Sequence, residues 1–181
     1  MRGYGRLTKQ ILELLATGAL LGFVRDRQEQ RKLLEDSDRI WYNIDRKQLF
    51  RILERLRLGG YVSLIKRAEG VEKASLTDKG KAKSLTYEFN ALTLPKSKKW
   101  DKKWRLVLFD IPETKKKIRD ALRRKLKALG FLEFQKSVFV YPYPCRDEIN
   151  FILNFWAIPE HVHYVEAPIT SDHKLREHFR V

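Results

Sequence analysis

An unbroken apolar run near the middle of the chain constrains its fold more than any other feature. Leu106-Val107-Leu108-Phe109 follows Trp104 and stops at a single acid, Asp110. A continuous run of this length is typical of a strand that is covered on one or both faces of a sheet. The sequence therefore predicts a central strand over 104–109, and Ile111-Pro112 turns the chain after it.

The segments after this strand predict one order of elements. A strongly basic amphipathic helix is expected from an N-cap at Thr114 to Leu129, and Gly130 ends it. Two short strands, a helix and a last strand are then expected over 131–134, 137–141, 147–156 and 162–165. This βαββαβ order is that of a ferredoxin-like fold.

The first part of the chain has a mostly helical pattern. Apolar residues recur at helical spacing from Leu7 to Leu21, and a second helix is expected over 26–35. A third helix is predicted between an N-cap at Asp45 and the Gly59-Gly60 pair. Its apolar face is formed by Leu49, Ile52, Leu53 and Leu56.

A hairpin and one more helix follow. The hairpin is expected over 61–76 with its turn near Gly70, and the helix runs from Thr77 to about Phe89. Helices that lead into a basic hairpin and a further helix have the order of a winged helix-turn-helix. The sequence therefore predicts an α+β chain of two domains, joined at the polar, basic segment after Leu94-Pro95. They are a winged helix-turn-helix domain over 1–95 and a ferredoxin-like domain over 96–181.

The charge of the chain points to a polyanionic partner. Its net charge of +15 comes from 38 Lys and Arg against 23 Asp and Glu, and nucleic acid is the commonest polyanion. In a winged helix-turn-helix the third helix enters the major groove, and the hairpin lies along the backbone or the minor groove. The candidate DNA-binding residues are Arg46, Lys47, Gln48, Arg51, Arg55, Lys66, Arg67 and Lys73. The plainer alternatives are solvated charged faces, or a winged helix that binds protein.

A second basic surface follows Asp110. Its candidate phosphate-contacting residues are Lys116, Arg119, Arg123, Arg124 and Lys127. Cys145 is the single cysteine, which excludes an internal disulfide and a Cys-based zinc site. No apolar run approaches the ~18 residues of a membrane span, and no signal-peptide pattern is present. We therefore expect a cytoplasmic protein without a membrane partner.

Three segments in the second half resemble a known family. WRLVLFDIP, RDALRRKLKALGF and QKSVFVYPYP, within residues 100–152, are similar to the central domain of the PaaX-type repressors, the phenylacetate-operon regulators. That domain in turn resembles the CRISPR-associated protein two family, small ferredoxin-like proteins of spacer acquisition. In the first half, the run 76–80 (LTDKG) matches the family best. PaaX-type repressors have a further C-terminal region, and the resemblance does not extend to one.

The resemblance implies a dimer and gives Asp110 a role. In the CRISPR family the strand-end aspartates of two subunits can hold a divalent ion, and Asp110 occupies the matching position. Such a pair with Mg²⁺ could activate water for phosphodiester hydrolysis. The alternative is that Asp110 caps the strand-to-helix turn.

These observations together favour a regulator over an enzyme. They predict a homodimeric transcriptional regulator, a repressor, that reads a palindromic site in double-stranded DNA with its two winged helices. No cofactor is expected for this function. The alternative is a Mg²⁺-dependent endonuclease or CRISPR spacer-acquisition component that uses Asp110 across a dimer, and the sequence leaves the question of enzymatic activity open.

Overall fold

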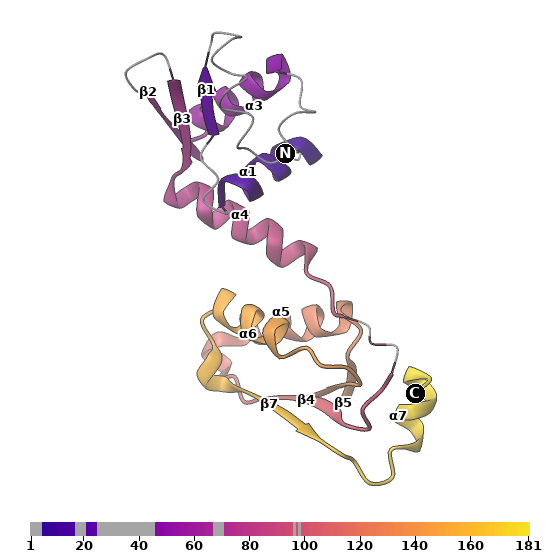
Figure 1. The fold of residues 1–181 in the computed structure, drawn as a ribbon. Coiled ribbons are helices and arrows are strands. Elements are labelled where there is room, and N and C mark those ends of the chain that lie inside the picture. Colours follow the sequence, from indigo (N-terminus) through magenta and orange to yellow (C-terminus); the bar gives the residue numbers. More distant parts are fainter. Residues whose placement is uncertain (1–4, 17–20, 25–45, 67–70, 96, 98) are drawn as a thin grey trace. The chain divides into compact units, whose positions relative to one another are not determined.

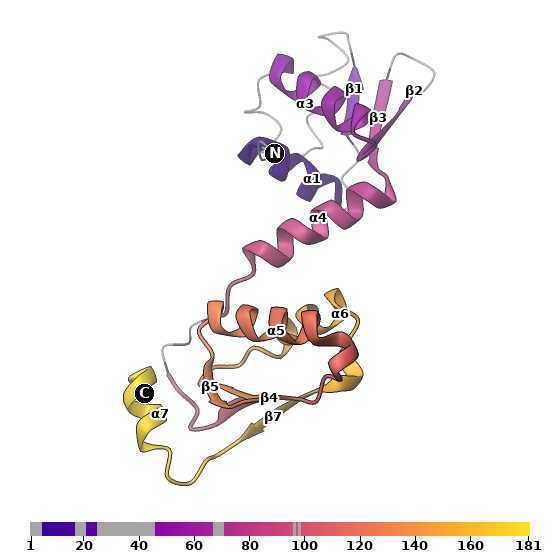
Figure 2. The same ribbon diagram turned by 180° about the vertical axis from the view of Figure 1, so that it is seen from behind.

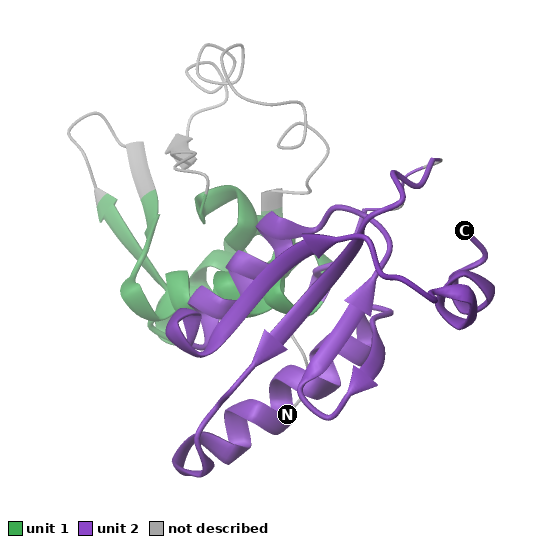
Figure 3. Cartoon of the chain, turned by 90° about the horizontal axis from the view of Figure 1, so that it is seen from below, with its two compact units in different colours: residues 1–90 green, residues 91–181 purple. Residues whose placement is uncertain are grey.

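The computed structural model describes the chain except for residues 1–4, 17–20, 25–45, 67–70, 96 and 98. The chain divides into two compact units, residues 1–90 (unit 1) and 91–181 (unit 2), coloured separately in Figure 3. Both units combine helices with an antiparallel sheet (Figure 1), so the chain is an α+β protein, as predicted. None of the helices within these described ranges is long and apolar enough to cross a membrane.

Unit 1 contains a three-stranded sheet and helices before, between and after its strands. Its elements are α1 (Arg6–Ala16), β1 (Leu21–Val24), α3 (Arg46–Leu58), β2 (Val62–Lys66), β3 (Val71–Leu76) and α4 (Asp78–Ala91). The strands pair antiparallel in the order β1-β3-β2. The predicted third helix, hairpin strands and last helix are thus all present.

The apolar faces of α1 and α3 form the core of unit 1. Ile11 and Leu12 of α1 are fully buried with Leu56 of α3, and Val62 and Ala74 of the sheet belong to the same cluster. The apolar face predicted for the third helix is confirmed, because all four of its residues are buried: Leu49, Ile52, Leu53 and Leu56.

The first helix ends earlier than its apolar spacing predicts. α1 stops at Ala16, and Leu21 instead begins β1, where it lies opposite Ala74 of β3. Pairing with β3 gives this segment backbone hydrogen bonds, so its helical spacing is overridden by a contact that is distant in the sequence. Three predicted features lie outside the described residues: the helix over 26–35, the Asp45 cap and the turn near Gly70.

The segment 76–80 joins three elements of unit 1. The Thr77 hydroxyl donates to the carbonyl oxygen of Gly60 (2.7 Å) and accepts from the backbone N–H of Gly80 (3.1 Å). The Tyr61 carbonyl accepts from the Thr77 N–H (3.1 Å). Gly80 lies so close to Tyr61 that a Cβ at this position would overlap the Tyr61 carbonyl oxygen. Thr77 and Gly80 therefore fix the end of α3, the start of β2 and the first turn of α4 together.

Unit 2 is a four-stranded antiparallel sheet with α5 and α6 on the same face (Figures 1 and 2). Its elements are β4 (Trp104–Phe109), η2 (Glu113–Lys115), α5 (Lys116–Ala128), β5 (Leu132–Gln135), β6 (Val138–Tyr141), α6 (Arg146–Phe155), η3 (Pro159–His161), β7 (Val162–Ala167) and α7 (His173–Phe179). The strand order is β5-β6-β4-β7, so β4 lies inside the sheet, as its apolar run predicts. From β4 to β7 the main elements follow the predicted βαββαβ order.

The first helix of unit 2 begins differently from the prediction. The 3-10 turn η2 precedes α5, with Pro112 at its N-cap, and neither helix has a side-chain cap. Thr114 lies inside η2, so its prediction as the N-cap is wrong. Pro112 has a φ of −63°, which suits the start of a helical turn, and the turn therefore begins before Thr114. Gly130 follows the end of α5 with a φ of +96°, as predicted.

The sequence pattern does not predict α7. Its buried residue Leu175 packs with Trp104 and Val140 of the sheet. The Asp172 carboxylate accepts hydrogen bonds from the Trp104 indole N–H and the Arg176 guanidinium, each at 2.9 Å. A short polar segment with one buried leucine has little periodic signal, so this helix depends on its contacts with the sheet.

Candidate nucleic-acid interface

α3 leaves a polar, basic face exposed on unit 1. Because its apolar face is buried, the rotation of the helix is fixed, and the intervening side chains face away from the core. Lys47, Gln48, Arg51 and Arg55 are all exposed. The other candidate DNA-binding side chains lie outside what the structure describes: Arg46, Lys66, Arg67 and Lys73.

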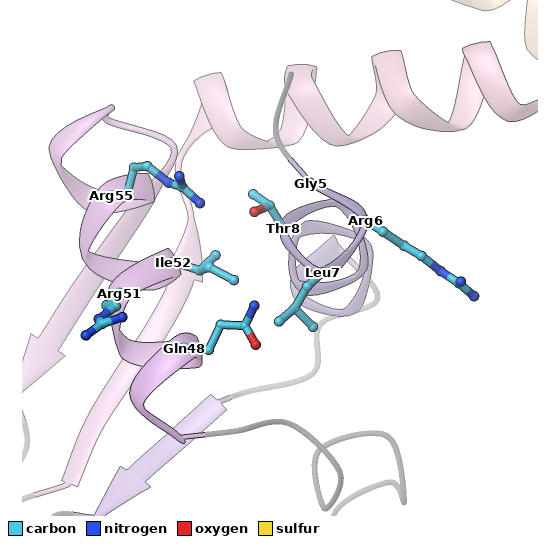
Figure 4. A pocket seen from close by; sticks show the side chains of 8 residues that line it. All are labelled: Gly5, Arg6, Leu7, Thr8, Gln48, Arg51, Ile52 and Arg55. Atoms are coloured by element: carbon cyan, nitrogen blue, oxygen red, sulfur yellow. The ribbon is translucent and has the colours of Figure 1, made fainter. Parts of the chain in front are cut away.

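Part of this polar face lines a hollow between α3 and the first turn of α1, which we call the α1–α3 hollow. Its volume is about 390 Å³. Figure 4 shows the Gln48 and Arg55 side chains pointing into it, toward Leu7 and Thr8 of α1, with Ile52 between them. The hollow therefore has an apolar floor and polar hydrogen-bond donors from α3.

Two further arginines stand at the sides of the α1–α3 hollow. Arg6 of α1 and Arg51 of α3 both line it, but their guanidinium groups point away from its centre (Figure 4). Among the described residues, no acid lines the hollow or lies in the first turn of α1. Sequence reasoning missed Arg6, because only the packing of α1 on α3 brings it near this site.

One exposed cation of α3 is held by a neighbouring acid. The Arg57 guanidinium donates to the Glu54 carboxylate (2.9 Å from Nε). This hydrogen bond lowers the pKa of the Glu54 carboxyl. Arg57 therefore carries its charge within a local ion pair on the same helix.

Glu113 neutralises part of the basic surface predicted on α5. Its carboxylate pairs with Lys116 (3.4 Å) and Arg119 (2.7 Å). The pKa of the Glu113 carboxyl is lowered, chiefly by the hydrogen bond from Arg119. Arg119 also donates to the carbonyl oxygen of Ile111 (3.2 Å), which holds its side chain against the turn before α5.

Glu133 of β5 offsets the charges of two further predicted residues, Arg123 and Lys127 of α5. Its carboxylate pairs with Lys127 (2.5 Å) and with Arg123. The pKa of the Glu133 carboxyl is lowered, chiefly by the hydrogen bond from Lys127 and also by the one from Arg123. Arg124 is exposed and forms no ion pair with any residue that the structure describes. Of the five predicted phosphate-contacting residues, Arg124 is therefore the one whose charge has no acidic partner within the described part of the chain.

Asp110 lies exposed at the end of β4. Its backbone N–H donates to the carbonyl oxygen of His161 (2.9 Å), which links the end of β4 to the turn before β7. The N-cap residues of η2 and α5, Pro112 and Lys115, make no side-chain cap hydrogen bond. The interpretation that Asp110 caps the strand-to-helix turn stays a prediction. Within the described ranges, no group of three or more His, Cys, Asp and Glu gathers as a metal site.

The comparison with known families concerns unit 2. The family model described as the PaaX protein central Cas2-like domain matches residues 97–179. Over residues 97–179 the chain is thus similar to the central domain of the PaaX family. The match runs from the segment before β4 through α7, and it includes the three motifs that carry the resemblance in the sequence. The comparison with curated proteins found no match.

Unit 2 begins with an ion pair between a buried arginine and an exposed aspartate. Arg105 of β4 is 2% exposed, and its guanidinium donates to both carboxylate oxygens of Asp101 (2.6 and 2.5 Å). It also donates to the carbonyl oxygens of Lys103 (2.8 Å) and Pro142 (2.9 Å). The hydrogen bonds from Arg105 lower the pKa of Asp101 to about 2. This network ties the chain segment before β4 to the sheet.

The single cysteine of the chain lies in unit 2 and is buried. Cys145 lies with its Sγ 3.9 Å from the Tyr164 hydroxyl. Burial raises the pKa of the Cys145 thiol to about 12, so the thiol stays protonated at neutral pH. A protonated, buried thiol is a poor nucleophile, which assigns Cys145 to the core.

Proposed function

We propose that the protein is a DNA-binding transcriptional repressor that acts as a homodimer. In this proposal, unit 1 is a winged helix-turn-helix domain and unit 2 is a ferredoxin-like dimerisation domain. The observation that carries the proposal is the exposed basic face of α3, directly before the antiparallel β2–β3 hairpin, in a chain whose other unit is similar to the PaaX central domain.

In the proposed complex, α3 lies in the major groove and the β2–β3 hairpin contacts the backbone or the minor groove. Arginine can bind a guanine edge with two hydrogen bonds, and Arg51 is an exposed arginine of α3. Lys47 suits a phosphate contact, since lysine acts as a point charge. The hairpin sequence adds Lys66, Arg67 and Lys73.

Dimerisation through unit 2 would present two copies of α3 to one DNA duplex. The strand order β5-β6-β4-β7, with α5 and α6 on one face, supports the ferredoxin-like assignment. A two-fold dimer matches a palindromic site whose half-sites lie one or more helical turns apart.

The test starts with the selection of bound duplexes from a random pool, using the full chain. Affinities for the selected duplex and for random DNA are then measured for Arg51→Ala, with Arg57→Ala as the matched control on the same helix. We expect Arg51→Ala to weaken binding to the selected duplex by about 1–3 kcal/mol, and to random DNA much less. A pool without a consensus, or equal losses on both duplexes, would contradict the proposal.

A second candidate function is metal-dependent cleavage of nucleic acid, alone or within a spacer-acquisition complex. The observation that favours it is the exposed carboxylate of Asp110 at the end of β4. Among the described residues, none forms an ion pair with this carboxylate. Two such carboxylates across a dimer, with Mg²⁺, would activate water. The test is cleavage of duplex DNA in Mg²⁺ or Mn²⁺, compared between the natural chain and Asp110→Ala. Cleavage that survives this substitution would remove Asp110 from the mechanism.

A further inference from the structure

A short basic turn, residues 99–103, lies near the start of unit 2 and belongs to neither of the two predicted basic surfaces. Its lysines, Lys99, Lys102 and Lys103, are all exposed. The one acid in the turn, Asp101, accepts hydrogen bonds from the Arg105 guanidinium on both carboxylate oxygens. Asp101 and Arg105 cancel in charge, so the three lysines leave the basic turn with a local charge of +3.

The lysines of the basic turn differ in this respect from many cations of the same unit. Glu113, Glu133 and Glu160 each pair with at least one cation of η2 or α5. By contrast, none of the three lysines of the basic turn forms an ion pair with any residue that the structure describes, since Arg105 holds the nearest acid in the sequence. Within the described part of the chain their charge is not offset, so it is available to an external polyanion.

Hydrogen bonds and ring packing order the backbone of the basic turn. The Trp100 indole N–H donates to the carbonyl oxygen of Lys103 (2.9 Å), and the Lys103 N–H donates to the Asp101 carboxylate (3.1 Å). The Trp100 ring packs on the buried Trp104 ring with centroids 4.8 Å apart, and the Arg176 guanidinium lies 5.0 Å from its centroid. Because the backbone is ordered before a partner binds, binding costs less conformational entropy.

We propose that the basic turn binds the phosphate backbone of duplex DNA, as a contact separate from α3. Lysine ammonium groups suit phosphates as point charges, and such contacts position a protein without reading its sequence. Trp100 is packed on Trp104, so the turn has no exposed apolar residue to insert into a lipid surface. This inference rests on the proposed function and deepens it, because it gives unit 2 a DNA contact of its own.

Three phosphate contacts have a measurable signature in salt. Each contact adds about 0.9 to the slope of log affinity against log salt for duplex DNA. The triple variant Lys99→Gln, Lys102→Gln and Lys103→Gln removes the three charges and should therefore lower this slope by about 2.7. Between about 50 and 200 mM salt, the natural chain should lose about 40-fold more affinity than the variant. The change should be equal on the selected duplex and on random DNA, because phosphates carry no sequence information.

The matched control removes the same charge from three lysines that have acidic partners. Lys9, Lys81 and Lys115 each lie 3.0–3.4 Å from a carboxylate oxygen, and their triple glutamine variant should change the slope by less than about one. A third variant carries arginine at all three positions of the basic turn and should keep the slope of the natural chain, since it keeps the charge. Thermal unfolding of the full chain shows that each variant is folded.

A glutamine variant of the basic turn with the salt slope of the natural chain, or with a change no larger than that of the control, would overturn the inference. Weaker binding to vesicles of anionic phospholipid without any loss on DNA would overturn it too, because the turn would then be a membrane contact. Failure of the proposed function looks different. The natural chain would then prefer no selected duplex, while the salt slopes on random DNA would still decide whether the basic turn binds phosphates.

Discussion

Gly80→Ala should destabilise unit 1, because the packing of Gly80 against Tyr61 and Leu76 leaves no room for a methyl group. A Cβ on Gly80 would lie 3.0 Å from both the Tyr61 carbonyl carbon and Leu76 Cδ2, and closer still to the Tyr61 carbonyl oxygen. Ordinary contacts of a carbon atom are about 3.5 Å or longer. The contact to the Tyr61 carbonyl oxygen is the tightest of the three, and to relieve it α4 and the start of β2 must separate by more than roughly 1 Å.

The cost of this separation can be estimated from the contacts that it disturbs. The Thr77 N–H bond to Tyr61, now 3.1 Å, would lengthen beyond the normal range, at a cost of about 1 kcal/mol. Overpacking adds about 1–3 kcal/mol, and the better helix propensity of alanine returns up to about 1 kcal/mol. The free energy of unfolding of unit 1 should therefore fall by about 2 kcal/mol.

Amide hydrogen exchange of the full chain is a suitable assay, because it reports on each unit separately. Protection in β2, β3 and α4 should fall roughly 30-fold, which corresponds to about 2 kcal/mol, while unit 2 is unchanged. Gly5→Ala is the control: nothing lies within 4 Å of the added Cβ, so its effect should stay below about 1 kcal/mol. Protection in Gly80→Ala equal to that of the natural chain would refute the steric reasoning.

Three further perturbations follow from ion pairs and exposed charges in unit 2. Arg105 depresses the pKa of Asp101, so the pair stabilises unit 2 above the unfolded pKa of Asp and this contribution is lost as the pH falls from about 4 to about 2. Because the Asp101 side chain is 46% exposed, we expect the free energy of unfolding of unit 2 to fall by only about 1 kcal/mol over this range. Unfolding is measured by tryptophan fluorescence in a Trp41→Phe background. The Asp101→Asn variant should lack this acid dependence. Arg124→Ala should weaken low-salt binding to random DNA more than Arg123→Ala, because Glu133 already pairs with Arg123. A titration in which Arg123→Ala loses more affinity than Arg124→Ala would argue against phosphate contact on α5. Asp110→Ala should leave affinity for the selected duplex within about 0.5 kcal/mol in chelator, and a larger change would place Asp110 in the DNA interface.

Much of the fold could be predicted because it rests on local patterns. The apolar run 106–109 identified an interior strand, and leucine spacing identified both α3 and α5, since the apolar face of each element is buried away from water. Gly130 could be predicted as a helix end because a positive φ is costly for other residues. These signals lie within a few residues of one another, so they are readable without knowledge of the fold.

The features that could not be predicted depend on contacts between distant segments. Leu21 lies in a strand only because β3, about fifty residues later, pairs with it. Arg123 and Lys127 face Glu133 because β5 returns beside α5, which reduces a basic surface that the sequence presents as uniform. At the candidate site, the sequence determined that α3 carries exposed arginine and glutamine opposite its leucines. Only the packing of α1 on α3 decided which of them point into the α1–α3 hollow and which point away from it, because that division is made by a neighbouring helix and not by the periodicity of α3 itself.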